Sequence, residues 1–321
     1  MMGGMSPRAA MPTGVALPEG PAGVIWRRIT SADLPAVHAL AAGIGQQDDP
    51  RNPPGRPELE QHLSAVDPDL HTALAVVDDR LVAYGIVFAA GSAVRLPGGV
   101  LPEARGTGIG RRLLAWQIEA ARAVRAADSV PISARQPVTA DATAALLARF
   151  GFRPERAFLH LRRPASPVAR SPLPAGLRTV PFDVTYDEPL RRAKNRAFED
   201  HWRSRPESPE AWARHQLGPW LRRDLSRLAL AEDGSIAGFV VGWDEGPADE
   251  LYVALVGTDP AWRGRGIARA LLTDVLAASA AAGRPVAILD VDGESPTSAD
   301  RLYASIGFER VSTALIHGLA P

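Results

Sequence analysis

Apolar residues repeat at helical spacing in two segments of this chain, one in each half. They are Leu113, Leu114 and Ile118 in the first segment, and Leu271, Leu272, Val275 and Leu276 in the second. Residues three to four positions apart lie on one side of a helix, so both segments predict amphipathic helices that bury one face. A glycine-rich run, itself preceded by a proline, leads into each helix.

Shorter apolar runs predict strands around these helices. In the first half residues 73–77 and 81–89 are joined by a tight polar turn, and 228–231 and 236–243 are joined in the same way in the second half. Another run follows the second helix at residues 286–291, and short strands are expected to begin near Val24 and Leu177. This order of elements predicts an α/β fold, a mixed sheet with helices on its faces.

The chain contains an internal repeat. Residues 105–110 recur as 263–268, the Phe-Gly-Phe run at 150–152 matches the Ile-Gly-Phe run at 306–308, and the apolar run around Gly85 matches that around Gly238. All three pairs are separated by about 155 residues. Such a constant separation predicts two copies of one domain, at 23–163 and 176–321, with a Pro-rich linker at 164–175 and a flexible tail at 1–22.

Composition narrows the possible functions. The chain has 321 residues, a net charge of +0 and no cysteine, which excludes disulfides and thiolate chemistry and gives no general case for nucleic acid or membrane-surface partners. No apolar run is long enough to span a membrane, and the N-terminus does not resemble a secretory signal, so we expect a cytoplasmic protein. Histidines are scattered without a metal-ligand pattern, and no metal is expected. The only lysine is Lys194, so neither glycine-rich run has the lysine of a Walker loop.

The glycine-rich runs could hold a phosphate group. A helix N-terminus presents free backbone N–H groups, glycines let an anion approach them, and Arg263, Arg265 and Arg269 add positive charge around the second run. For one run alone, a simple tight turn is an equally good reading. A dinucleotide-binding site is disfavoured, because that motif follows the first strand of its unit, and here several strands come first.

The two runs resemble a known motif. Residues 100–110 and 258–268 are similar to the acetyl-CoA motif of the GNAT superfamily of N-acetyltransferases, Arg/Gln-x-x-Gly-x-Gly/Ala, and residues 299–308 resemble its second motif. The tandem layout also resembles that of the mycothiol synthases. Where the family usually has an Asn before the second motif, this chain has residues 295–298, Ser-Pro-Thr-Ser.

The resemblance implies two tandem GNAT-like acyl-CoA N-acyltransferase domains that use acetyl-CoA. Backbone amides of the loop would hold the pyrophosphate, and acetyl-CoA would lie where a bulge splays the fourth strand from the fifth. The residues expected at the cofactor are Val256, Gly257, Thr258, Arg263, Gly264, Arg265, Gly266, Ile267, Ala268 and Arg269 in the second half, and Val100, Arg105, Gly106, Thr107, Gly108, Ile109 and Gly110 in the first.

The resemblance also implies the catalytic residues. Tyr303 stands where the family often has a tyrosine that protonates the leaving thiolate, and the repeat places Leu147 at this position in the first half. The N-terminal copy is therefore expected to be non-catalytic. Glu250 is the candidate base, although it lies two residues further upstream than expected, where Tyr252 fits, unless a bulge reconciles the spacing. A solvated strand end is the alternative for Glu250, and Asp290 and Asp292 are weaker candidates.

The acceptor would lie over the first helices of the second half. Asp200, His201 and Trp202 are the candidate residues there, because aromatic and acidic groups can hold an amine, while packing and helix capping explain them equally well. Tyr252 on the fourth strand is a further candidate for contact with the acceptor. The sequence thus predicts N-acetyl transfer to a small-molecule amine in a ternary complex, by a monomer or a homodimer. The alternatives are a protein or peptide N-acetyltransferase and a non-catalytic acyl-CoA-binding sensor.

Overall fold

A computed structural model describes residues 14–50, 56–90, 92–125, 127, 129–163, 168–244, 250–297 and 299–320. Its N-terminal half follows the predicted order of strands and helices. The strands are β1 (Ile25–Arg27), β2 (Thr72–Val77), β3 (Arg80–Ile86), β4 (Phe88–Ala90), β5 (Ala93–Arg95), β6 (Gly98–Val100), β7 (Ile132–Pro137) and β8 (Arg153–Arg163). The helices are α1 (Leu34–Asp48), α2 (Arg56–Ser64), α3 (Pro68–His71), α4 (Ile109–Val124) and α5 (Asp141–Arg149).

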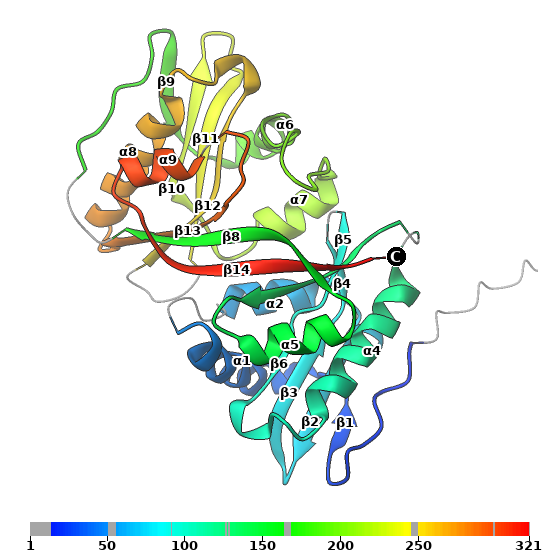
Figure 1. Ribbon diagram of the computed structural model, residues 1–321. Coiled ribbons are helices and arrows are strands. Elements are labelled where there is room, and N and C mark those ends of the chain that lie inside the picture. Colours follow the sequence, from blue (N-terminus) through cyan, green and yellow to red (C-terminus); the bar gives the residue numbers. More distant parts are fainter. Residues whose placement is uncertain are drawn as a thin grey trace, which may run out of the picture.

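The C-terminal half repeats this order with fewer elements: β11 stands in place of β3 and β4, β12 stands in place of β5 and β6, and α3 has no counterpart. Its strands are β9 (Leu177–Pro181), β10 (Leu221–Ala231), β11 (Ile236–Trp243), β12 (Glu250–Thr258), β13 (Val286–Asp292) and β14 (Glu309–Leu319). Its helices are α6 (Asp187–Ala197), α7 (Pro209–Gln216), α8 (Ile267–Ala281) and α9 (Ala299–Ser305). The mixed α/β fold and its duplication are confirmed (Figure 1).

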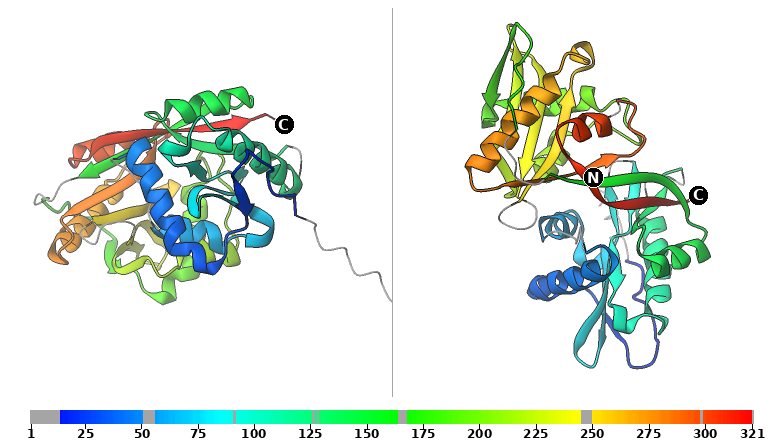
Figure 2. Two further views of the ribbon diagram at one scale, coloured as in Figure 1. Left: turned by 90° about the horizontal axis from the view of Figure 1, so that it is seen from below. Right: turned by 60° about the vertical axis from the view of Figure 1, so that its left-hand side comes forward.

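The two halves exchange their last strands. The order in the ten-stranded sheet is β4-β5-β7-β14-β8-β13-β12-β11-β10-β9, and a smaller sheet has the order β1-β2-β3-β6. Strand β8 of the first half thus pairs with β13 of the second, and β14 of the second half pairs with β7 of the first. The two exchanged strands also pair with each other and cross the middle of the molecule side by side (Figures 1 and 2).

Separate apolar cores lie on the two faces of the sheet in each half. In the second half, α8 and α9 pack on one face around Leu271 and Leu272, and α6 and α7 pack on the other around Leu190 and Phe239. All four of these side chains are fully buried. Residues on β12 therefore face one of two helical layers according to their position along the strand.

The segments predicted as tail and linker both contact the domains where they are described. Val15 and Leu17 pack against the N-terminal core, and Arg28 donates to the Val15 carbonyl at 2.7 Å. In the linker, the Ser171 N–H donates to the Thr273 hydroxyl on α8 at 3.0 Å. Residues 1–13 and 164–167 lie outside the described residues.

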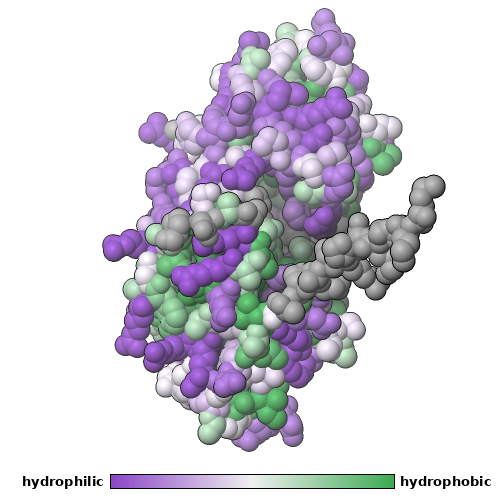
Figure 3. Space-filling model, turned by 90° about the vertical axis from the view of Figure 1, so that its right-hand side faces the viewer, coloured by the Kyte–Doolittle hydropathy of each residue, from purple (hydrophilic) through white to green (hydrophobic). Residues whose placement is uncertain are grey.

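Surface polarity differs between the halves on the face shown in Figure 3. Hydrophilic residues dominate its upper part, which belongs to the C-terminal half, and apolar residues gather mainly below. Within the described part of the chain, no helix is both long and apolar enough to cross a bilayer.

Candidate acetyl-transfer site

Both glycine-rich runs form strand-to-helix turns with open space above their backbone. Gly108 precedes α4 with φ 94°, and Gly266 precedes α8 with φ 80°. Gly106 and Gly264 also have positive φ, which L side chains rarely adopt. A Cβ atom added at any of these four glycines would meet nothing within 4 Å. The backbone N–H groups at both helix starts are thus accessible to an anion, as a pyrophosphate requires.

The leading arginine of each run anchors the loop to the helical layer above it. Arg263 bonds to the Asp200 carboxylate at 2.6 and 3.2 Å and to the Ala197 carbonyl at 2.9 Å. Arg105 bonds to both oxygens of Asp48 in the same way, at 2.8 and 2.9 Å. Asp200 was predicted to contact the acceptor, but in this structure it holds the glycine loop in place. The side chain of Arg263 is likewise directed to Asp200.

The other predicted cofactor residues surround the two loops. Thr107 donates to the Ala104 carbonyl, Arg265 lies over the Trp262 ring at 4.8 Å, and Arg269 donates to the Ser305 hydroxyl. Ile109 and Ile267 are buried at the helix starts, while Val100, Gly110, Val256, Thr258 and Ala268 flank the loops on the adjoining strands and helix turns. Gly257 has a packing role, because a Cβ there would lie 2.2 Å from the Phe239 ring.

Strands β12 and β13 pair over only three residues and then separate. Their parallel ladder begins at Glu250↔Val286 and ends at Tyr252↔Ile288. On the other side of β12, the pairing with β11 skips Ala254, which marks a bulge of one residue. A bulge of two residues is needed to bring Glu250 to the position that the motif spacing predicts, whereas the structure has a bulge of one residue. Beyond Tyr252 the N–H groups of β12 that point toward β13 have no ladder partner, and they border the gap.

Glu250 and Tyr252 face a cavity that also reaches the N-terminal half. The Glu250 carboxylate accepts hydrogen bonds from Arg162 on β8, at 2.9 and 3.3 Å. Tyr252 lies beside Trp243, with ring centroids 6.2 Å apart. Glu250 is therefore not a solvated strand end: its side chain is 14% exposed and held by a residue from the other half.

The repeat correctly pairs Tyr303 with Leu147. In each half the backbone N–H groups three and five residues later bond to the carbonyl of this residue, from Ile306 and Phe308 to Tyr303 and from Phe150 and Phe152 to Leu147. Tyr303 is 7% exposed and packs edge-on against Phe308. Burial raises the pKa of Tyr303 above its usual value, so the phenol keeps its proton at neutral pH.

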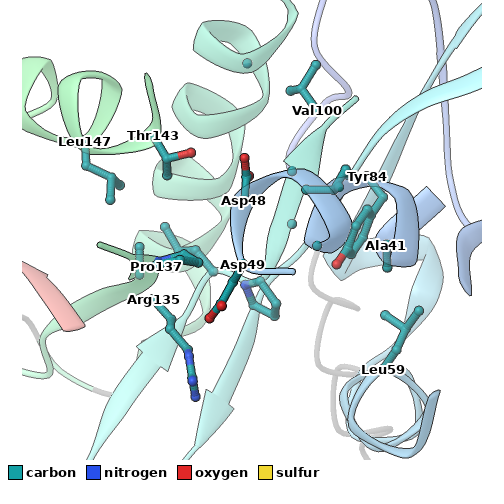
Figure 4. Close-up of a pocket in the computed structure, with 18 of the residues that line it drawn as sticks. Ala41, Asp48, Asp49, Leu59, Tyr84, Val100, Arg135, Pro137, Thr143 and Leu147 are labelled. Carbon is teal, nitrogen blue, oxygen red and sulfur yellow. The ribbon is translucent and has the colours of Figure 1, made fainter. Parts of the chain in front are cut away.

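A cavity of about 1640 Å³ joins the two halves. Its lining includes Gly106, Gly108 and Gly110 of the first glycine loop together with Glu250 and Tyr252 of the second half. Figure 4 shows its N-terminal part, where Asp48, Tyr84, Val100, Arg135 and Leu147 surround the open space. The first glycine loop therefore retains room for a ligand although its half has Leu147 in place of a tyrosine.

The predicted acceptor residues after α6 lie against the exchanged strand β8. The Trp202 ring is tilted against the Phe158 ring, with centroids 6.4 Å apart, and the guanidinium groups of Arg156 and Arg203 lie 5.7 and 4.5 Å from the Trp202 centroid. The His201 ring lies 4.4 Å from that of Phe198, and burial lowers the pKa of His201 below its usual value. His201 and Trp202 thus have packing partners, and their role at the acceptor stays a prediction.

Sequence reasoning missed a polar cluster around the buried His160 at the same cavity. His160 on β8 contacts Asp290 on β13 through Nδ1 at 3.0 Å, and Arg135 on β7 donates to the second oxygen of Asp290 at 3.1 Å. The related candidate Asp292 is bound by Arg156 at 2.8 and 2.9 Å. Polar residues alternate with apolar ones near the end of β8, and the sequence shows this pattern. The sequence does not show that β8 pairs with β13, because that pairing depends on the strand exchange. Among the residues the structure describes, no cluster of three potential ligands is arranged for a metal ion.

Comparisons with known proteins agree with this geometry. The model of the acetyltransferase (GNAT) family matches residues 36–152 and 189–308. A mycothiol acetyltransferase of Thermobispora bispora is 35% identical over 305 residues, covering 88% of this chain and 95% of the relative. One from Salinispora arenicola is 33% identical, with 89% and 92% covered.

Solved structures show the same tandem fold. A GCN5-related N-acetyltransferase from Sphaerobacter thermophilus matches with a TM-score of 0.77 and 26% identity, covering 93% of this chain and 96% of that one. A tandem GNAT protein from the clavulanic acid biosynthesis pathway, with a TM-score of 0.68 and 18% identity, covers 92% and 98% and shares the fold. The chain therefore belongs to the GNAT family, as an acetyl-CoA-dependent N-acetyltransferase with two tandem domains.

Proposed function

We propose that the C-terminal half transfers the acetyl group of acetyl-CoA to the primary amine of a small molecule of the mycothiol kind, by direct attack in a ternary complex. The relatives named above supply this acceptor class. The observation that carries the assignment to this half is the gap that opens between β12 and β13 after Tyr252, because β12 leads to the second glycine loop and Glu250 lies two residues before the opening. The strands around this gap, the exchanged β8 included, all come from one chain, so either a monomer or a homodimer could carry the site.

The same position in the N-terminal half lacks both catalytic groups. Counted back from the leading arginine of each glycine loop, Glu250 corresponds to Ser92, and the repeat places Leu147 at the position of Tyr303. This half therefore has neither a carboxylate nor a phenol at the two positions, and it would bind a CoA group at its open loop without acting on it.

The chemistry follows from the residues around the gap. Glu250 would take a proton from the bound ammonium group, directly or through water, so that a neutral amine attacks the thioester carbon. Backbone N–H groups of β12 beyond Tyr252 face the gap and can donate to the developing oxyanion. Tyr303, whose phenol keeps its proton, would donate it to the departing thiolate.

The acceptor class can be tested by thiol release from acetyl-CoA with a panel of small amines and a panel of peptides. Rapid release with small amines, above all with an amino sugar conjugate that carries a cysteinyl amine, is the expected result. Preference for the peptides would instead indicate a protein N-acetyltransferase. Binding of acetyl-CoA without turnover on either panel would indicate a sensor, and calorimetry would then count the occupied sites.

A further inference from the structure

The nitrogen of the acceptor loses two protons in this reaction, and Glu250 accounts for one. An ammonium group carries three hydrogens and the amide product carries one. The first proton leaves before attack, because only the neutral amine is a nucleophile, and the second leaves the positively charged nitrogen of the tetrahedral intermediate. A second acceptor near the gap is therefore expected, an expectation that rests on the function proposed above.

The strand register places His160 next to the point where the gap opens. The ladder between β12 and β13 ends at Tyr252↔Ile288, and Asp290 lies two residues further along β13, on the same face. His160 is the direct partner of Asp290 across the β13–β8 ladder. Ile288, Asp290 and His160 all line the cavity that Glu250 and Tyr252 face.

The side chain of His160 is held in one orientation. Its Nδ1 lies 3.0 Å from Oδ1 of Asp290, and Arg135 donates to Oδ2 of the same carboxylate. Burial works to raise the pKa of Asp290, but Arg135 and His160 outweigh it and lower that pKa, so Asp290 is ionised. An ionised carboxylate only accepts hydrogen bonds, which assigns the proton of a neutral imidazole to Nδ1 and leaves the lone pair on Nε2.

We propose that His160 is a further catalytic residue, whose Nε2 accepts the second proton of the acceptor nitrogen from the tetrahedral intermediate. The C–N bond has then formed, the C–S bond breaks, and the thiolate takes the proton of Tyr303. Of the two protons taken from nitrogen, one restores Tyr303 and the other passes to solvent. Asp290 and Arg135 are positioning residues in this scheme, and the N-terminal half contributes His160 through its exchanged strand.

Several charged and polar groups surround this imidazole. Asp290 comes from β13, Arg135 from β7, Glu250 from β12, and Arg162 lies two residues away on β8 itself. Strand β14 contributes Ser312, the residue opposite His160 in the β8–β14 ladder. The pairing of Arg162 with Glu250 and of Arg135 with Asp290 leaves each carboxylate in contact with one arginine.

The test compares His160→Gln with Glu250→Gln in the full chain, with pH profiles of kcat as the readout. Glutamine can still donate to Asp290 but cannot take a proton, so His160→Gln should lower kcat by about 10²–10⁴-fold and change the acidic limb of its profile. An acceptor analogue whose amine is already neutral at the assay pH should restore much of the rate of Glu250→Gln. It should not restore that of His160→Gln, because the second proton leaves after attack.

His71→Gln on α3, where Nδ1 of His71 lies 3.1 Å from a backbone carbonyl, is the matched control and should retain the wild-type profile. If the wild type is active and His160→Gln keeps the same rate and pH profile, the role of His160 is overturned while the proposed function stands. Equal rescue of both variants by the neutral amine would overturn the role of His160 as well. Absence of acetyl transfer by the wild type on every amine would overturn the proposed function and the role of His160 together.

Discussion

At the scale of single residues, corresponding backbone positions of the two halves carry side chains with different chemistry. Tyr303 and Leu147 accept the same pair of backbone hydrogen bonds, and both are buried. Glu250 likewise corresponds to Ser92, counted back from the leading arginine of each glycine loop. Under the function proposed above, a few side chains on one shared scaffold decide which half is catalytic.

Replacing Tyr303 by Phe should lower kcat by about 10²-fold or more with little change in the KM for acetyl-CoA, because the ring still packs on Phe308 while the proton donor is lost. Steady-state thiol release, together with a thermal melt to confirm folding, measures this. If the variant keeps a kcat within about twofold of the wild type, Tyr303 is a packing residue and not the acid.

Sequence patterns reveal functional residues when the residues that act together lie close to one another in the chain. The glycine loops and the Tyr303–Leu147 pair follow from short motifs and a constant separation. The contact between His160 and Asp290 joins residues 130 positions apart, and it exists only because β8 lies beside β13. The role of Asp200 in anchoring Arg263 was hidden for the same reason, since the two side chains come from different layers.

At the scale of elements, α6 and α7 are joined by a partly buried cluster of polar side chains around Glu207. Glu207 in the loop between them has Lys194 at 2.9 Å and His215 at 3.6 Å, and its backbone N–H donates to Asn195. Burial alone would raise the pKa of Glu207, but His215 and Lys194 lower it to about 2. This cluster fixes the helical layer that carries His201 and Trp202.

The lowered pKa of Glu207 predicts how the free energy of unfolding changes in acid. A folded-state pKa below the ordinary value stabilises the protein above pH 4.5, and that contribution is lost as the pH falls toward about 2. Allowing for partial exposure, the loss is roughly 2 kcal/mol in the free energy of unfolding. Glu207→Gln should lose less stability than the wild type between pH 6 and pH 3 in urea unfolding. An equal loss in both proteins would show that Glu207 does not contribute.

At the scale of the whole molecule, the strand exchange makes the two halves one structure. The sequence repeat predicts two similar domains in a row, and their cores are indeed separate. It does not predict that β8 completes the sheet of the second half or that β14 completes that of the first, because a strand's hydrophobic pattern fits either neighbour equally well.

Because of this exchange, we expect both halves to unfold in one transition. Unfolding either half would remove a strand from the other sheet, so an intermediate with one folded half should not be populated. Variants that retain either Trp116 of the first half or Trp220 of the second as a reporter can follow each half in denaturant. Coincident midpoints are expected, and two separate midpoints would show independent domains.

The central claim is that acetyl transfer takes place in the C-terminal half, and the matched variants Gly266→Val and Gly108→Val test it most directly. Both glycines have left-handed φ values and open space above them, so valine disturbs each loop in a comparable way. The measurement is the rate of acetyl-CoA-dependent thiol release with a saturating amine. We predict that Gly266→Val abolishes the rate while Gly108→Val retains most of it. Equal losses, or a loss in Gly108→Val alone, would contradict the account.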